Sequence, residues 1–78
     1  IKPALAYLDI INVAKTNYNI PIIAYNVSGE YSMIKSSAEN GYINEIEVVL
    51  ETIYAMKRAG ANAIITYYAL ELSKNLKY

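Results

Sequence analysis

Short apolar runs alternate with amphipathic stretches along this chain, and the alternation predicts parallel strands connected by helices. Two of the runs are almost wholly apolar and lack in–out alternation, which is typical of parallel strands buried on both faces. The expected elements, in chain order, are the end of an extended segment at 1–3, a helix at 4–15, a strand at 22–27, a helix that ends near 39, a helix between 44 and 60, a strand at 63–68 and a helix at about 70–76. Right-handed crossovers would join the extended segments into one sheet.

The stretch between Asn44 and Gly60 carries the clearest helix signals. Asn44 suits the N-cap position, and Glu47 three residues later completes an asparagine variant of the capping box. Lys57 and Arg58 fall in the last turn, where the helix dipole favours cations, and Gly60 follows as the stop. The apolar side chains that recur at helical spacing are Ile46, Val49, Leu50, Ile53 and Met56.

Composition limits both the size and the function of the molecule. The chain has 78 residues, no cysteine, no histidine, and seven basic residues balanced by seven acidic ones. It can form one domain at most, and we expect no disulfide framework, no thiolate metal site and no nucleic-acid surface. No apolar run approaches the ~18 residues of a membrane span. However, 55% of the residues are hydrophobic, so we expect a segment of a larger protein.

The length also fits part of a barrel. A complete (β/α)8 barrel has ~250 residues, or ~31 for each βα unit, so this chain would hold about two and a half units. An open three-stranded sheet with helices gives the same pattern of elements. The pattern alone therefore leaves both architectures open.

Three polar residues stand at the carboxyl ends of the expected strands, the edge where parallel α/β proteins carry their active sites. They are Lys2, Ser28 and Tyr67. A lysine that is partly desolvated there becomes neutral more readily, and a neutral amine can attack a ketone to form a Schiff base. The alternative is an ordinary solvated lysine, which is the commoner case.

The serine and the tyrosines have structural alternatives as well. Ser28 could cap the following helix, or its hydroxyl and nearby N–H groups could hold a carboxylate at the positive end of that helix. Tyr67 and Tyr68 should point to opposite faces of their strand, because side chains alternate. They and Tyr25 could equally be core residues whose hydroxyls bond locally. Taken alone, these residues do not name a reaction.

Four blocks of sequence together resemble the porphobilinogen synthase family, also called 5-aminolevulinate dehydratase. The blocks are KPALAYLDI at 2–10, AYNVSGEY at 24–31, KRAGAN at 57–62 and IITYY at 64–68. The first resembles the segment around the Schiff-base lysine, and the others resemble the next barrel strand, the end of the last helix and the final strand. Because the blocks occur in order over essentially the whole chain, the resemblance is more specific than any single motif.

The resemblance implies that residues 1–78 form the C-terminal part of a TIM (β/α)8 barrel, about two and a half βα units, without separate domains. It implies an enzyme of haem (tetrapyrrole) biosynthesis that condenses two 5-aminolevulinate molecules into porphobilinogen with loss of two waters. The complete enzyme is expected to be a cytoplasmic homo-octamer that uses zinc or magnesium. No cofactor or metal ligand is expected within this segment.

Four residues take roles from the resemblance. Lys2 matches the lysine that forms the Schiff base with the substrate. Ser28 and Tyr67 match the residues that hydrogen-bond the carboxylate of that substrate, and Tyr25 matches an aromatic that packs beside the lysine. The family's second catalytic lysine lies upstream, so the isolated chain is expected to be inactive.

Two other functions fit the pattern of elements. The chain could be a non-catalytic α/β interaction module, in which Lys2 is solvated, Ser28 caps a helix and the tyrosines are core. Such a module would cover its strand edges with its own helices. A different lysine-using barrel, such as an aldolase, is the third interpretation, and the VSGE block at 27–30 and the TYY block at 66–68 argue against it.

Overall fold

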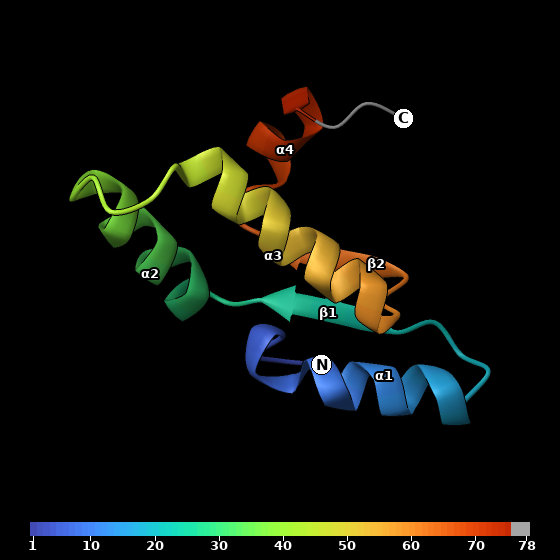
Figure 1. Cartoon of the computed structure of the whole chain (residues 1–78). Coiled ribbons are helices and arrows are strands. Elements are labelled where there is room, and N and C mark those ends of the chain that lie inside the picture. Colours follow the sequence, from blue (N-terminus) through green and yellow to red (C-terminus); the bar gives the residue numbers. More distant parts are fainter. Residues whose placement is uncertain (76–78) are drawn as a thin grey trace.

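The computed structural model describes residues 1–75, which form a two-stranded parallel sheet with helices packed against it (Figure 1). The elements, in chain order, are the 3-10 helix η1 (Leu5–Tyr7), α1 (Leu8–Asn17), β1 (Ile23–Asn26), α2 (Ser28–Glu39), α3 (Glu45–Ala59), β2 (Ala63–Thr66) and α4 (Ala69–Asn75). None of the helices in this described part combines the length and the apolar character that a membrane span requires. The predicted alternation of strands and helices is confirmed.

Two strands and one further extended residue lie side by side in parallel. In the sheet, Ile23 lies opposite Ala63 and each later residue of β1 follows in register. Along the other edge of β1, the Ile1 amino group donates to the Ile23 carbonyl at 2.7 Å, and the Ile1 carbonyl accepts from the Tyr25 N–H at 2.9 Å. These bonds are those of a parallel ladder in which Ile1 is level with Ala24. β1 therefore lies between Ile1 on one side and β2 on the other.

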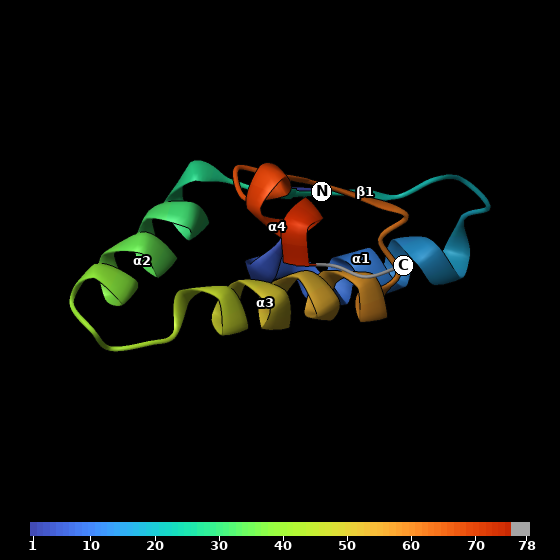
Figure 2. The same ribbon diagram turned by 90° about the horizontal axis from the view of Figure 1, so that it is seen from above.

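The helices pack on one face of the sheet and leave the other face bare (Figure 2). On the covered face, Ala24 and Asn26 are 0% and 1% exposed, whereas Ile23 and Ile65 on the opposite face are 47% and 55% exposed. The prediction that both strands are buried on both faces is therefore wrong for the described residues. The apolar runs indicated that both faces of the sheet would be covered, but the described helices cover only one of them.

The hydrophobic core lies between the covered face and the helices, with α1 and α3 in contact beneath the strands. Its buried apolar members are Ala4, Ile11, Ile22, Ala24, Ile34, Val49, Ile53, Met56, Tyr68 and Leu72. The predicted N-cap and stop of α3 are confirmed: Asn44 Oδ1 accepts from the Glu47 N–H at 3.1 Å, and Gly60 ends the helix with a φ of 124°.

Several boundaries differ from the predicted ones. The helix expected at 4–15 starts as η1, and α1 begins only at Leu8 because Tyr7, with φ −126° and ψ 33°, is not helical. The strand expected at 63–68 ends at Thr66, and Tyr67 and Tyr68 form a turn. The last helix starts at Ala69, and its expected end at 76 lies outside the described residues.

Candidate active site

Three of the four predicted site residues meet at the carboxyl edge of the sheet, on its bare face. Ile1 is level with Ala24, so Lys2 is level with Tyr25. Residues that are level in a parallel sheet point to the same face. Tyr25 pairs with Ile65, and Tyr67 lies two residues later in the turn after β2, with its side chain next to that of Tyr25. Lys2 and Tyr67 are exposed and Tyr25 is half-buried. Tyr25 therefore stands between the lysine and the second tyrosine.

Tyr67 is held in place by two other tyrosines. Hydrogen bonding to the Tyr25 side chain raises the pKa of Tyr67 above its ordinary value, which for a tyrosine is about 10 and leaves the hydroxyl protonated at neutral pH. The ring of Tyr31, in the first turn of α2, lies 5.4 Å from the ring of Tyr67, measured between centroids. The site edge thus offers a neutral phenol, whose single O–H would turn from Tyr25 to donate to a ligand.

Ser28 opens α2 directly behind the carboxyl end of β1 (Figure 1). The N-cap of this helix is Val27, with an extended backbone and no capping bond from its side chain, and Ser28 is the first helical residue. The interpretation of Ser28 as a helix cap is therefore wrong, because the chain enters the helix one residue earlier. Its exposed side chain stands instead at the partially positive end of the helix dipole.

A buried hydrogen-bond network lies beneath the same edge, on the covered face. The Tyr68 N–H donates to Thr66 Oγ1 at 3.2 Å, and Thr66 Oγ1 donates to Asn26 Oδ1 at 2.8 Å. Asn26 Nδ2 then donates to Glu30 Oε1 at 2.7 Å, and the Leu5 N–H donates to Glu30 Oε2 at 2.9 Å. Asn26 and Glu30 are 1% and 5% exposed. Buried polar groups are tolerated when they are paired in this way.

Tyr68 belongs to the covered side of the sheet. Its hydroxyl donates to Glu45 Oε2 at 2.9 Å, and Lys35 lies 2.8 Å from the same oxygen. Burial, together with the bond to Glu45, raises the pKa of Tyr68 well above its ordinary value. Its ring lies 4.8 Å from that of Tyr31. Tyr67 is exposed and Tyr68 is buried, but both lie in the turn after β2 and not on opposite faces of a strand as predicted.

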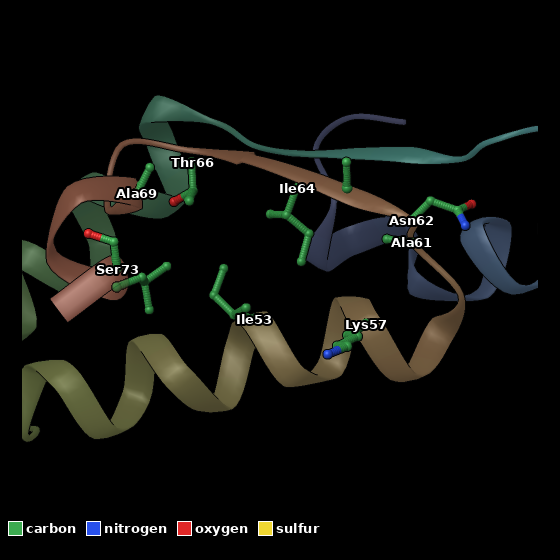
Figure 3. A pocket seen from close by; sticks show the side chains of 10 residues that line it. Ile53, Lys57, Ala61, Asn62, Ile64, Thr66, Ala69 and Ser73 are labelled. Carbon is green, nitrogen blue, oxygen red and sulfur yellow. The ribbon is translucent and has the colours of Figure 1, made fainter. Parts of the chain in front are cut away.

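A cavity of about 340 Å³ lies on the helix side of the sheet, between β2, α3 and α4 (Figure 3). In Figure 3, Ile64 of β2 and Ile53 of α3 point toward one another across it, with Ala69 of α4 at one end. None of the four residues named from the resemblance lines this cavity. The cavity is therefore separate from the edge at which Lys2, Tyr25 and Tyr67 lie.

The described residues do not fit a metal site. Within residues 1–75, no three side chains of histidine, cysteine, aspartate or glutamate gather closely enough to hold an ion. The zinc or magnesium expected for the complete enzyme thus has no set of ligands among them.

Sequence reasoning missed Asn26, Glu30 and Thr66, which support the site from below. One signal could have found the first two: Asn26 is a polar residue inside an apolar run, and Glu30 follows four residues later, one helical turn into α2. A buried amide requires partners, and an acid at this spacing can supply one. The role of Thr66 could not be predicted in this way, because its place opposite Asn26 depends on the register of β1 against β2.

This geometry defines a parallel α/β unit that carries a lysine and two tyrosines at the carboxyl edge of its sheet, as a segment of an α/β enzyme would. The family model for delta-aminolevulinic acid dehydratase matches residues 1–75. The proteins of that name from Staphylococcus aureus (strain Mu50) and Staphylococcus epidermidis are each 55% identical to this chain over 76 residues, which is 97% of the chain and 24% of the relative.

A solved structure gives the same match in three dimensions. It is the crystal structure of delta-aminolevulinic acid dehydratase (porphobilinogen synthase) from Toxoplasma gondii ME49 in complex with the reaction product porphobilinogen. Its TM-score is 0.95 at 47% identity, over 97% of this chain and 22% of that chain. The chain belongs to the delta-aminolevulinic acid dehydratase family, and it spans about a quarter of the length of the curated relatives it matches.

Proposed function

We propose that this chain is the part of a delta-aminolevulinic acid dehydratase that carries the Schiff-base lysine, and that this lysine is Lys2. The complete enzyme then condenses two 5-aminolevulinate molecules into porphobilinogen with loss of two waters. The observation that carries the proposal is the position of Lys2, level with Tyr25 on the bare face of the sheet, in a chain of this family.

The bare face supports a place inside a barrel. In a (β/α)8 barrel the helices form an outer ring and the opposite face of the sheet lines the interior, with the active site at the carboxyl ends of the strands. The described helices all pack on one face of the sheet (Figure 2), and the exposed side chain of Tyr67 does not lie among them. We therefore propose that the chain is the C-terminal part, about two and a half βα units, of such a barrel.

The chemistry assigned to Lys2 needs a neutral amine. The amine nitrogen adds to the ketone carbon of the substrate, and the ketone oxygen leaves as water, which gives an imine between Lys2 and the substrate. Once protonated, the imine withdraws electrons from the neighbouring carbon and makes its C–H bond acidic. That proton passes to a general base of the complete enzyme, and the imine stabilises the carbanion that remains for bond formation with the second substrate molecule.

The remaining residues hold the other end of the same substrate. Tyr67 presents a protonated hydroxyl, and Ser28 presents one at the positive end of α2, so both can donate to a carboxylate. Tyr25 lies between Lys2 and Tyr67 and bonds to the latter, which suits an aromatic that packs beside the lysine. Fixing the carboxylate orients the reacting carbon toward the amine.

Other features of the complete enzyme stay predictions from the resemblance. These are the homo-octameric assembly, the cytoplasmic location, the use of zinc or magnesium, and the inactivity of the isolated chain. The alternative of an interaction module is disfavoured by the family match and by the sheet face that the chain's own helices leave uncovered.

The test uses a complete enzyme in which this chain replaces the matched 76-residue segment of the Staphylococcus aureus relative, called the hybrid enzyme below. We expect it to convert 5-aminolevulinate into porphobilinogen. Lys2→Arg should abolish turnover, because a guanidinium stays protonated and cannot form the imine. Lys74→Arg on α4 is the matched control and should leave turnover unchanged. Full turnover by Lys2→Arg, or a folded hybrid without turnover, would overturn the proposal.

A further inference from the structure

The segment that carries Lys2 is tied down on both sides of that residue. Before it, Ile1 pairs with β1 through two backbone hydrogen bonds. After it, the Ala4 N–H donates to the Tyr25 carbonyl at 3.1 Å, and the Leu5 N–H donates to Glu30 Oε2 at 2.9 Å. The side chain of Glu30 thus links the Lys2 segment to α2, the helix that Ser28 opens.

The same carboxylate is linked to the turn that carries Tyr67. A carboxylate can only accept, so Glu30 takes the NH2 group of Asn26, and Asn26 Oδ1 is left to accept from the Thr66 hydroxyl. Thr66 Oγ1 also accepts from the Tyr68 N–H. The chain of donors from Tyr68 through Thr66 and Asn26 therefore ends on one oxygen of Glu30, and the Leu5 N–H donates to the other.

We infer that Glu30 is a positioning residue for the reaction: its buried carboxylate fixes the Lys2 segment relative to the turns that carry Ser28 and Tyr67. This inference rests on the proposed function. Glu30 is buried on the covered side of the sheet edge. It does not touch the substrate in this proposal, and its effect is to fix the distance between Lys2 and Tyr67 on the opposite side. A misplacement of about 1 Å between reacting groups can cost on the order of 10²-fold in rate.

A glutamine at position 30 removes one acceptor with little change of shape. Its amide has a single oxygen, so in either orientation one of the donors from Leu5 and Asn26 faces an NH2 group. Adding Asn26→Asp restores the balance of donors and acceptors. The new amide then donates to the new carboxylate and accepts from Leu5, while Thr66 still donates to position 26.

The experiment measures kcat and KM of the hybrid enzyme per active site, with sites counted by borohydride trapping of bound substrate. Glu30→Gln should lower kcat about ten- to a hundredfold. KM should change less, because the groups proposed to hold the carboxylate remain. The double variant Glu30→Gln with Asn26→Asp should recover kcat to within about threefold of the unsubstituted hybrid. Glu39→Gln, an exposed acid on the same helix, is the control and should have no effect.

Counting trapped sites separates positioning from folding. A purely structural role would reduce the number of sites and leave kcat per site unchanged, and that result would overturn the inference. A double variant no better than Glu30→Gln alone would also overturn it. If the unsubstituted hybrid lacks turnover, the proposed function fails and the inference falls with it, so the two failures can be told apart.

Discussion

Two adjacent tyrosines have opposite environments and, in our account, different roles. Tyr67 is 56% exposed on the bare face, whereas Tyr68 is 1% exposed and bonded to Glu45 on the covered face. Because the chain turns directly after β2, Tyr67, which is proposed to bind substrate, is followed immediately by Tyr68, which bonds to α3. A matched pair of substitutions can therefore separate binding from stability.

Tyr67→Phe in the hybrid enzyme should raise KM for 5-aminolevulinate about tenfold or more and change kcat less, because a hydrogen bond to a charged carboxylate is lost. Tyr68→Phe should leave KM unchanged and lower the free energy of unfolding by about 0.5–1.5 kcal/mol, through loss of its bond to Glu45. Steady-state kinetics and urea unfolding measure both. Equal effects of the two substitutions on KM would contradict the assignment of Tyr67.

Glu45 provides a pH-dependent contribution to stability. Hydrogen bonds from Lys35 and then Tyr68 lower the pKa of Glu45 below its usual value of 4.5. A carboxyl whose pKa is lower in the folded state stabilises the fold above its unfolded pKa, and this contribution is lost as pH falls through the folded pKa. The size is small because the side chain is 33% exposed to solvent.

Glu45→Gln should therefore lower the unfolding midpoint of the hybrid enzyme at pH 7 and have less effect near pH 4. Glu51→Gln, an exposed acid on the same helix, serves as the control for a general change in charge. Thermal unfolding followed at both pH values gives the comparison. A difference between Glu45→Gln and the unsubstituted enzyme that grows on acidification would be inconsistent with the lowered pKa.

At the scale of elements, α3 could be predicted from the sequence because all of its signals are local. Its cap, its apolar stripe and its terminal glycine each depend on residues within one turn of the position concerned. The start of α1 could not be predicted in the same way. The non-helical backbone of Tyr7 falls at the end of η1, and the first residue of η1, Leu5, donates to Glu30, which is 25 positions away in sequence.

Gly60 gives a test of the close packing between two elements. It ends α3 with a φ of 124°, and a Cβ built there would lie 2.7 Å from Cβ of Lys15 in α1. Gly60→Ala should cost about 2 kcal/mol or more, from backbone strain and from the shift forced on Lys15. Gly41→Ala, with a φ of 75° and open space around it, should cost only the strain, about 1 kcal/mol.

Denaturant unfolding of the hybrid enzyme measures both glycine substitutions. An alanine at position 60 that is tolerated as well as one at position 41 would contradict the close approach of α1 to the end of α3.

At the scale of the whole molecule, the site edge was predictable and the support beneath it was not. Parallel strands end at one edge, so Lys2 and Tyr67 could be placed together without knowing any contact. The bond between Thr66 and Asn26 joins residues 40 positions apart, and it depends on the register of β1 against β2. The bare face was mispredicted for a related reason: an apolar strand indicates that a face is covered, but not by which part of a protein.

The central claim is that Lys2 forms the Schiff base. The most direct measurement reduces the hybrid enzyme with borohydride in the presence of 5-aminolevulinate and maps the modified lysine by peptide mass spectrometry. Our account predicts a substrate adduct on Lys2 that disappears in Lys2→Arg and persists in Lys74→Arg. An adduct on another lysine of this chain, such as Lys15 or Lys35, or an active enzyme with Lys2 unmodified, would contradict it.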